Sequence, residues 1–417
     1  MKVLVIGSGG REHAICMKLK DSPLVSDLFA CPGNAGIEGL AKLTDIKPME
    51  FEKIYDFSRK EGIDLVFVAP DDPLAGGLVN YLEERGINAF GPRAEAAIIE
   101  GSKAFSKAFM KRHNIPTADY EEFTDVNKAI EYIKMRNKYP AVIKADGLAL
   151  GKGVIIAEDE KDAISALHEM MECKVFGDAG SKVIIEEYLT GREVTVLAFT
   201  DGETIYPMPS SQDHKKAFDY DKGPNTGGMG AFSPAIGYTK GAERETLEKI
   251  IFPTIKGLKE EGRKFKGVIY FGLMVTDKGV KVIEYNARFG DPETEAILPL
   301  LKTDLMEIIL AIMNDNLASI NIEWESKIGF CVIVASGTYP GKVIKGFPIS
   351  IGDLDKRITL FHCGTAKKED KLVTNGGRVL CLSTVSNSMD EARELVYSEI
   401  NKISFEGARY RTDIGKK

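Results

Sequence analysis

The sequence predicts a multidomain protein with a β-rich, antiparallel centre between two α/β regions, one at its N-terminus and one at its C-terminus. Strand patterns alternate with helical patterns over residues 1–100, which is typical of an open parallel sheet. From residue 101 the apolar runs instead follow one another through short glycine turns, as in antiparallel hairpins. The 417 residues allow about three domains at ~150 residues each.

The N-terminal alternation begins with KVLVI (2–6), a short β-branched run typical of a strand buried on both faces. It passes through a glycine turn into a helical pattern with Ala14, Ile15 and Leu19 on one side. Further strands are expected at 28–34, 63–73 and 87–92, and further helices at 51–62 and 74–86.

The centre and the tail are expected to combine strands with fewer helices. A helix should end before Pro116, and two apolar runs around a glycine-rich turn predict a hairpin over 139–157. Further strands are expected at 181–208, 266–277, 279–289, 328–337, 357–366 and 377–386, and helices at 241–261, 302–314 and 389–403.

Composition excludes several classes of protein. The formal charge is −7 and no basic block is interleaved with aromatic residues, so nucleic acid is not an expected partner. No apolar run approaches the ~20 residues that span a bilayer, and the N-terminus has no signal-peptide pattern. The six cysteines show no CxxC or paired spacing, which favours reduced thiols and a cytoplasmic protein without a membrane partner.

The N-terminal turn GSGGRE (7–12) departs from the dinucleotide-binding fingerprint. Glu12 stands where the third glycine is needed, and no acidic residue ends the second expected strand, so a nicotinamide or flavin site is disfavoured. Gly9 and Gly10 instead place amide groups at a helix start beside Arg11, which predicts a cradle for phosphate or carboxylate. The motif alone leaves open a turn that serves packing only.

The segment VIEYNARFGD (282–291) is the most informative for chemistry. Glu284, Asn286 and Arg288 alternate along an expected strand, so their side chains should share one face. Oxygen ligands at this spacing suit Mg²⁺ on nucleotide phosphates, and an arginine beside them suits developing negative charge. A solvated strand face is the alternative, and the metal–phosphate site is favoured over it.

Two glycine-rich stretches are weaker signals. DGLALGKG (146–153), next to Lys144, predicts a flap over phosphates but lacks the P-loop pattern. KGPNTGGMGAFSP (222–234) shows no apolar period and predicts a loop, either an ordinary surface loop or one whose backbone approaches a ligand. The histidines have no metal-ligand spacing and no GxSxG occurs, so a hydrolase with a covalent nucleophile is not supported.

Taken together, several motifs resemble one family. GSGGREHA, CPGNAGI, ADGLALGKGV, EEYLTGRE, SSQDHKKAFDYDKGPNTGGMGAFSP and EYNARFGDPE occur in this order, as in the glycinamide ribonucleotide synthetases of the ATP-grasp superfamily. The resemblance covers essentially the whole chain. It implies ligation of glycine to 5-phosphoribosylamine through glycyl phosphate, with ATP as co-substrate, Mg²⁺ or Mn²⁺ as cofactor, and a monomeric enzyme.

The resemblance also implies an ATP-grasp fold with a Rossmann-like N-terminal domain and a C-terminal α+β domain. Its parts are a substrate-binding domain (1–100), the main ATP-grasp domain (101–115 and 188–325), an ATP lid (116–187) and the C-terminal domain (326–417). The residues implied for ATP are Lys103, Lys144, Gly151, Glu186, Tyr188, Leu189 and Glu193. Those implied for the other substrates are Gly9, Gly10, Arg11, Asn34, Gly227, Gly228 and Met229. Glu284 and Asn286 are the implied metal ligands, with Arg288 and Asp291 beside the reacting groups.

Four positions depart from the family pattern. Lys216 stands for arginine, Tyr220 for glycine, Asp72 for glutamate and Glu295 for glutamine, which puts local loop geometry in doubt. Two alternative functions are an ATP-grasp ligase of the carboxylase type and a nucleotide-binding sensor without turnover. The 222–234 segment disfavours the first, and Lys144, Glu284, Asn286 and Arg288 disfavour the second.

Overall fold

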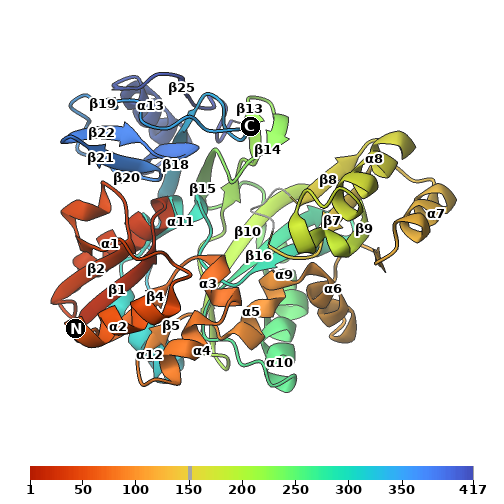
Figure 1. Ribbon diagram of the computed structural model, residues 1–417, viewed down its shortest axis with the longest axis horizontal. Helices are drawn as coiled ribbons and strands as arrows, with labels where there is room; N and C mark the ends of the chain where they lie inside the picture. The colour runs from red at the N-terminus through yellow and green to blue at the C-terminus, as the bar shows by residue number, and fades with distance from the viewer. Residues whose placement is uncertain (149–152, 417) are drawn as a thin grey trace.

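The computed structural model describes residues 1–148 and 153–416, which form a three-part body with a projecting lobe (Figure 1). The first part is a five-stranded parallel sheet of order β3-β2-β1-β4-β5. Along β1, Val3 and Val5 enter one hydrophobic core while Leu4 and Ile6 enter another, because both faces of the sheet are covered. The predicted parallel sheet is therefore confirmed. Its elements are β1 (Lys2–Gly7), α1 (Gly10–Lys20), β2 (Asp27–Pro32), η1 (Ile37–Gly39), β3 (Lys42–Leu43), α2 (Phe51–Glu61), β4 (Leu65–Val68), α3 (Asp71–Ala75), α4 (Leu78–Glu83) and β5 (Ala89–Phe90).

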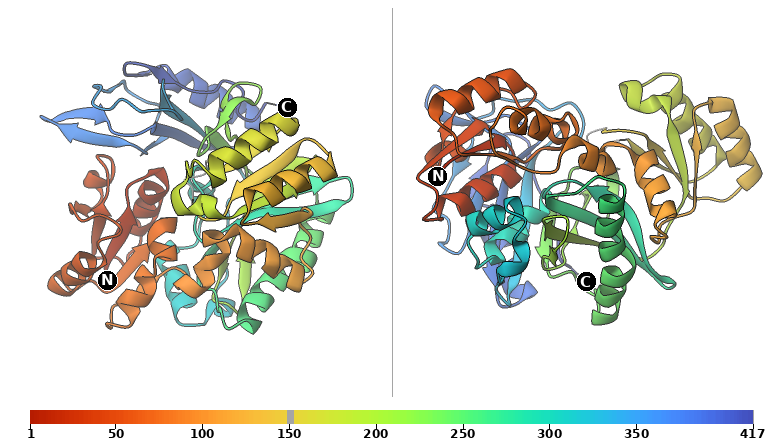
Figure 2. Two further views of the ribbon diagram at one scale, coloured as in Figure 1. Left: turned by 45° about the vertical axis from the view of Figure 1, so that its right-hand side comes forward. Right: turned by 90° about the horizontal axis from the view of Figure 1, so that it is seen from below.

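The projecting lobe is a four-stranded antiparallel sheet of order β6-β9-β7-β8 with two helices on it. It has a hydrophobic core of its own, and Figures 1 and 2 show it standing apart from the body. The hairpin expected over 139–157 is confirmed in the pairing of β7 with β8. Gly151, expected in its turn, lies outside the described residues. The elements are β6 (Tyr120–Phe123), α7 (Val126–Arg136), β7 (Ala141–Ala145), β8 (Val154–Ala157), α8 (Glu160–Met171), η2 (Gly177–Ser181) and β9 (Val183–Glu187).

The centre of the body is an antiparallel sheet of order β11-β10-β16-β17, beside helices that lead into the lobe. The helix expected over 241–261 is interrupted by a π-helical turn, η3, between its two α-helical halves. The elements here are α5 (Ala94–Gly101), α6 (Lys103–Arg112), β10 (Arg192–Thr200), β11 (Ile205–Pro207), α9 (Lys240–Thr246), η3 (Leu247–Ile251), α10 (Phe252–Glu260), β16 (Gly267–Thr276) and β17 (Gly279–Asn286). They are followed by α11 (Glu293–Ile297), η4 (Leu298–Leu300), α12 (Leu305–Met313) and η5 (Leu317–Ser319).

The third part is a six-stranded sheet of order β12-β15-β18-β23-β20, with β25 also paired to β18. It takes β12 and β15 from before residue 326, so the sheet crosses the boundary expected for a C-terminal domain. Two small hairpins and α13 complete this part. The elements are β12 (Gln212–Asp213), β13 (Lys216–Phe218), β14 (Lys222–Asn225), β15 (Gly230–Ser233), β18 (Ile328–Ser336), β19 (Ser350–Ile351), β20 (Thr359–His362), β21 (Thr365–Lys368), β22 (Lys371–Thr374), β23 (Arg378–Ser386), α13 (Met389–Ile400), β24 (Ile403–Ser404) and β25 (Ala408–Arg409).

The expectation of a continuous loop over 222–234 is wrong. Both ends of this segment are strands, β14 and β15, and only the residues between them form a turn. Glycine is required at position 230 by the close approach of β15 to β18, because a Cβ there would lie 2.6 Å from the carbonyl oxygen of Cys331. No helix in the described part of the chain has the length and apolar character needed to cross a membrane.

Candidate active site

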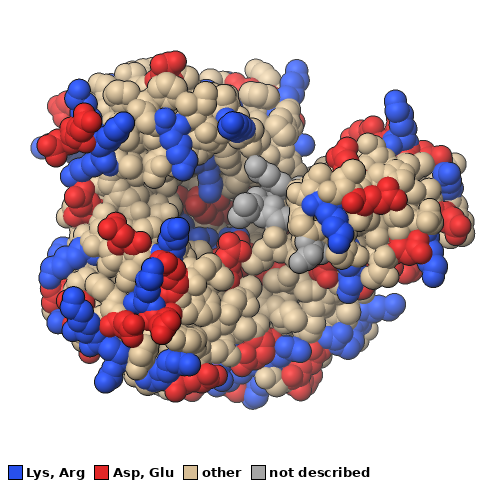
Figure 3. Space-filling model, in the orientation of Figure 1, with Lys and Arg blue, Asp and Glu red and all other residues tan. Residues whose placement is uncertain are grey.

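A cavity of about 310 Å³ lies between the sheet of the lobe and the central sheet. Figure 3 shows a hollow with acidic and basic side chains at its base, beside the projecting lobe. Eleven of the residues singled out from the sequence line this cavity: Lys103, Lys144, Glu186, Tyr188, Leu189, Glu193, Gly227, Glu284, Asn286, Arg288 and Asp291. Residues separated by almost 190 positions in the chain are thus brought together in one place.

On the lobe side, two lysines share one buried carboxylate. Lys144 Nζ lies 3.0 Å and Lys107 Nζ lies 3.2 Å from Glu186 Oε2, and all three side chains are buried. Burial lowers the pKa of Lys107 to about 8, although Glu186 opposes that shift. Lys103, one helical turn before Lys107 on α6, donates to the carbonyl oxygen of Gly147 at 2.7 Å. This wall of the cavity therefore brings three lysines together beside Glu186 and Gly147.

Across the cavity, Glu284 stands on β17 among cations. Lys215 Nζ lies 3.4 Å from Glu284 Oε1 and 3.7 Å from Glu193 Oε2. Burial would raise the pKa of Glu284, but Lys215, Lys144 and Lys103 outweigh it and lower that pKa below its usual value. Glu284 is therefore an ionised carboxylate on the cavity wall.

The oxygen atoms of Glu284 and Asn286 fit a divalent cation that is held mainly by phosphates. Among the described residues, Asn286 Oδ1 accepts a single hydrogen bond, a long one of 3.4 Å from Arg288. The described residues contain no cluster of three or more His, Cys, Asp and Glu side chains that could hold a metal alone. Mg²⁺ typically keeps several waters and takes one or two carboxylates plus substrate phosphates, which this pair satisfies.

Arg288 is the second residue after β17 and is held by two acidic side chains. Its Nη2 lies 2.9 Å from Glu100 Oε1 and 3.5 Å from Asp71 Oδ2. Glu100 also accepts a 2.7 Å hydrogen bond from the backbone amide of Ala287. Burial raises the pKa of Glu100 to about 7, with Arg288 opposing and Asp71 reinforcing the shift. The guanidinium thus has a fixed place beside the two candidate metal ligands.

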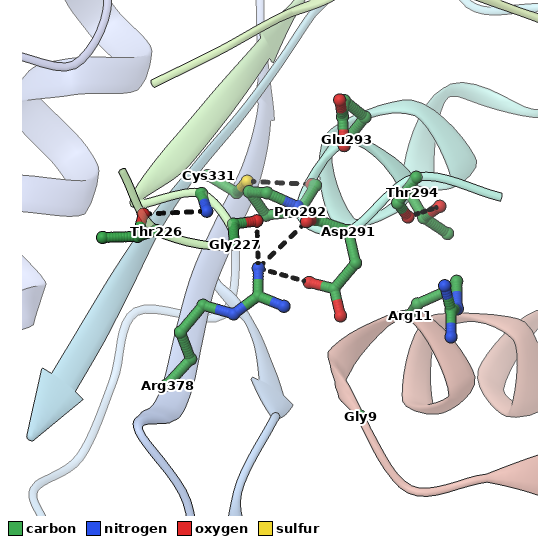
Figure 4. A network of polar contacts seen from close by, with 12 residues as sticks. Gly9, Arg11, Thr226, Gly227, Asp291, Pro292, Glu293, Thr294, Cys331 and Arg378 are labelled. Atoms are coloured by element: carbon green, nitrogen blue, oxygen red, sulfur yellow. Dashed lines mark hydrogen bonds and ion pairs between the residues drawn. The ribbon is translucent and has the colours of Figure 1, made fainter. Parts of the chain in front are cut away.

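Asp291 occupies a corner of the cavity where segments from three parts of the body meet (Figure 4). Arg378 Nη1, at the start of β23, lies 2.9 Å from Asp291 Oδ1. On the other side, a Cβ on Gly9 would lie 3.3 Å from Asp291 Oδ2, so the N-terminal turn lies against the same carboxylate.

Gly9, Gly10, Arg11 and Asn34 lie beside the cavity rather than in its lining. The Gly9 amide donates to Glu12 Oε2 at 2.6 Å, so it is not the free donor that the sequence suggested. Gly10 packs against Glu295 and Cys363. Arg11 pairs with Glu12 at 2.6 Å and donates to the carbonyl oxygen of Phe289 at 3.2 Å.

The Asn34 side chain hydrogen-bonds to backbone groups of three neighbouring segments in this conformation. Its amide nitrogen donates to the carbonyl oxygens of Ser8 at 2.8 Å and His362 at 2.7 Å. Its oxygen accepts from the amides of Gly36 at 2.9 Å and Ile37 at 3.0 Å. All its usual hydrogen-bonding positions are therefore occupied within the chain.

The backbone amides of Gly227, Gly228 and Met229 are also occupied. They donate to Tyr339 Oη at 2.7 Å, Thr226 Oγ1 at 3.0 Å and the His214 carbonyl oxygen at 2.8 Å, respectively. The Met229 side chain is fully buried in the core. Recognition of a ligand by these three amides is therefore not available in this conformation, and Gly227 alone of them lines the cavity.

Several cavity residues were not predicted from the sequence: Asp71, Glu100, Lys107, Asp213, Lys215 and Glu293. Nor was Arg378, which contacts a lining residue. Helical spacing from Lys103 could have indicated Lys107, and the position after β4 could have indicated Asp71, because ligands bind at the carboxyl ends of parallel strands. Nothing in the local sequence marks Arg378.

Comparison with known proteins identifies the family. Three models cover nearly the whole chain: the N domain of phosphoribosylglycinamide synthetase matches residues 1–100, its ATP-grasp (A) domain residues 101–294 and its C domain residues 329–417. A phosphoribosylamine–glycine ligase of Caldanaerobacter subterraneus is 48% identical over 414 residues, 99% of each chain. One of Escherichia coli K12 is 45% identical over 424 residues, 100% of this chain and 98% of the other.

Solved structures agree with this result. The crystal structure of phosphoribosylamine–glycine ligase from Thermotoga maritima matches with a TM-score of 0.87 and 34% identity, over 99% of this chain and 100% of the other. The biotin carboxylase domain of a Hydrogenobacter thermophilus 2-oxoglutarate carboxylase matches with a TM-score of 0.73 over 98% and 91%, and its 18% identity shows the shared fold alone. The chain therefore belongs to the phosphoribosylglycinamide synthetase family of ATP-grasp enzymes, the phosphoribosylamine–glycine ligases.

Proposed function

We propose that this protein joins glycine to 5-phosphoribosylamine at the expense of ATP, giving glycinamide ribonucleotide, ADP and phosphate in purine biosynthesis. The observation that carries the proposal is the set of side chains that line the cavity. The ionised carboxylate of Glu284 and the amide oxygen of Asn286 share it with the cations of Lys103, Lys144 and Arg288. That set of charges suits a triphosphate with a divalent cation. The full-length relatives named as phosphoribosylamine–glycine ligases support the identity of the other two substrates.

The reaction needs no nucleophile from the protein. A carboxylate oxygen of glycine attacks the γ-phosphorus of ATP, and the bond to the β–γ bridging oxygen breaks to release ADP. The amine nitrogen of phosphoribosylamine then attacks the carbonyl carbon of glycyl phosphate, phosphate leaves, and the nitrogen loses a proton. The protein positions the reactants, neutralises charge with lysine and arginine, and keeps water from the acyl phosphate.

The metal-binding residues of this proposal are Glu284 and Asn286. A bound Mg²⁺ or Mn²⁺ would neutralise negative charge that develops on the transferred phosphoryl group. In the same proposal the lobe of residues 116–187 is the ATP lid, because Glu186 and Lys144 lie on its sheet while Glu284 lies on the central sheet opposite.

ADP formation measured with and without each substrate tests the proposal. We expect turnover only when glycine, phosphoribosylamine and ATP are all present. Glycine labelled with ¹⁸O in its carboxylate should transfer one ¹⁸O atom to the released phosphate, because the attacking oxygen leaves with the phosphoryl group. Turnover that depends on bicarbonate instead of glycine would establish the carboxylase alternative, and the absence of turnover with all substrates would favour a binding protein.

A further inference from the structure

Arg378 joins two segments of the site that are far apart in the sequence. Its Nη1 donates to the carbonyl oxygen of Gly227 at 2.8 Å and to that of Asp291 at 2.9 Å, and it lies 2.9 Å from Asp291 Oδ1 (Figure 4). The Arg378 side chain is 18% exposed and that of Asp291 is 15% exposed, so the ion pair is largely desolvated. One cation thus holds both the backbone and the carboxylate of Asp291.

The segments that Arg378 contacts are also held by other interactions. Tyr339 Oη accepts from the amide of Gly227 at 2.7 Å, and the Tyr339 carbonyl oxygen accepts in turn from Arg409. Gly228 packs against the ring of Pro292, so the glycine turn and the residue after Asp291 touch directly. Two residues of the third part of the body, Tyr339 and Arg378, thus contact the cavity-lining residues Gly227 and Asp291.

We infer that Arg378 is a positioning residue of the ligase reaction, which fixes the Asp291 carboxylate and the Gly227 carbonyl beside the reacting groups. The inference rests on the proposed function, because it assigns Arg378 a part in that reaction. It also assigns the third part of the body a part in catalysis, since Arg378 lies on its sheet.

The guanidinium of Arg378 places one nitrogen, Nη1, among all three oxygen atoms. Three oxygen atoms from two segments surround one end of Arg378, and the planar fork holds that end in a fixed direction. A lysine ammonium also has three N–H donors, but its flexible stem does not fix their direction. Without a cation, the Asp291 carboxylate would lose its ion pair and could turn away from the N-terminal turn at Gly9. A displacement of about 1 Å near reacting groups can cost ~100-fold in rate.

Arg378→Ala and Arg378→Lys, assayed for ADP formation with each substrate varied, test this inference. We expect kcat to fall about 100-fold in Arg378→Ala and less in Arg378→Lys, with the Michaelis constant for ATP within about twofold of the wild type. Guanidinium ion at millimolar concentration should restore part of the kcat of Arg378→Ala, because it can occupy the vacated position. Arg357→Ala is the matched control, since Arg357 pairs with Asp355 on the exposed surface of the same part of the body and should show wild-type kinetics.

The outcomes separate this inference from the proposed function. Wild-type turnover with glycine and phosphoribosylamine establishes the function whatever the variants do. A kcat within threefold of wild type in both Arg378 variants would overturn the positioning role. So would a loss that raises all Michaelis constants together, lowers the melting temperature and does not respond to guanidinium, because that pattern indicates a purely structural residue. If Arg378→Ala does not fold, the decision rests on kcat of Arg378→Lys.

Discussion

Glu100 Oε1 lies 2.9 Å from Arg288 Nη2, while the second oxygen of the same carboxylate accepts a 2.7 Å hydrogen bond from the Ala287 amide. One side chain on α5 therefore fixes both the guanidinium and the backbone directly after the candidate metal ligand Asn286. Asp71 approaches the same guanidinium at 3.5 Å, so the parallel-sheet part of the body determines the position of a charge in the ATP cavity.

This relationship predicts an acid limb in the pH profile of kcat. Burial raises the pKa of Glu100 to about 7, so the ion pair with Arg288 is complete above pH 7 and is lost as the pH falls through that value. Arg288, Asp71 and Arg11 are the charged groups that influence Glu100. We expect Glu100→Gln to have a lower kcat at pH 8 and a profile without the limb near pH 7.

The folding stability of the wild type should change with pH in the opposite direction to kcat, and Glu100 is again the group responsible. Because the pKa of Glu100 in the folded state lies above its ordinary value of 4.5, its ionisation weakens folding as the pH rises from about 4.5 to 7. The melting temperature of Glu100→Gln relative to the wild type should therefore increase over that interval. A difference that does not change with pH would contradict the raised pKa.

We next expect Glu284→Gln to lose most turnover while it still folds and binds ATP. The substitution removes the charge of the proposed metal ligand and also the partner that Lys215 contacts at 3.4 Å, so neutralisation in the transition state should suffer most. A fall in kcat of at least ~100-fold is expected from the loss of such a group. The variant should also need more Mg²⁺ for half-maximal activity.

Glu323→Gln is the control for this experiment, because Glu323 forms a 2.9 Å ion pair with Lys302 on the surface. It should behave as the wild type. Turnover of Glu284→Gln within a few-fold of the wild type would exclude Glu284 as a metal ligand.

Much of the fold is predictable from local pattern. The run KVLVI and its successors predict a parallel sheet because strands buried on both faces are apolar throughout, and the structure confirms it. The alternation of Glu284, Asn286 and Arg288 predicts a shared face because strand geometry has a period of two, and all three line the cavity.

What local pattern cannot predict is pairing between distant segments. KGPNTGGMGAFSP has the composition of a loop, yet two of its parts become strands because β13, β12 and β18 provide partners. The positive φ of Tyr220, 59°, is also set by tertiary contacts, since its amide donates to Asp413 Oδ2 at 2.7 Å. This conformation accounts for the glycine expected at that position.

The same limit applies to site residues. Neither Arg378 nor Glu100 belongs to a sequence motif. Each pairs with a residue that is distant in the chain, Arg378 with Asp291 and Glu100 with Arg288. Conversely, Asn34 belongs to a recognisable motif, but the structure places its amide among backbone groups. A motif thus indicates that a residue type is needed, and only the fold shows whether its atoms are available to a ligand.

Arg11 supports a fourth prediction. Its Nε and Nη1 are occupied by Glu12 and the Phe289 carbonyl oxygen, whereas Nη2 has no hydrogen bond to any described residue. We expect Nη2 to bind the phosphate of phosphoribosylamine, so Arg11→Ala should raise the Michaelis constant for that substrate at least tenfold. The constant for ATP should change little.

Arg85→Ala is the matched control for Arg11, because Arg85 lies on the surface of the same part of the body, over the ring of Tyr81. Arg11 also bonds the Phe289 carbonyl oxygen, to which Arg288 donates at 3.1 Å, so a loss of stability is expected with the loss of affinity. An equal increase in the constants for ATP and phosphoribosylamine would place Arg11 outside the phosphate site.

The last prediction concerns Lys107, which shares the Glu186 carboxylate with Lys144 on the lobe side of the cavity. Without Lys107, the positive charge of Lys144 would be neutralised by Glu186 alone and would be less available to the triphosphate. We therefore expect Lys107→Met to weaken ATP binding about tenfold, which is the usual scale for a lost charged hydrogen bond.

Because the pKa of Lys107 is lowered to about 8, its charge is present below pH 8 and lost above it, so ATP affinity of the wild type should fall as the pH rises from 7 to 9. Binding of a non-hydrolysable ATP analogue, measured by calorimetry across that range, should show this fall in the wild type and in Lys111→Met, an exposed neighbour on the same helix. Lys107→Met should bind weakly with no such fall, and wild-type affinity of this variant at all three pH values 7, 8 and 9 would contradict a role for Lys107 in the ATP site.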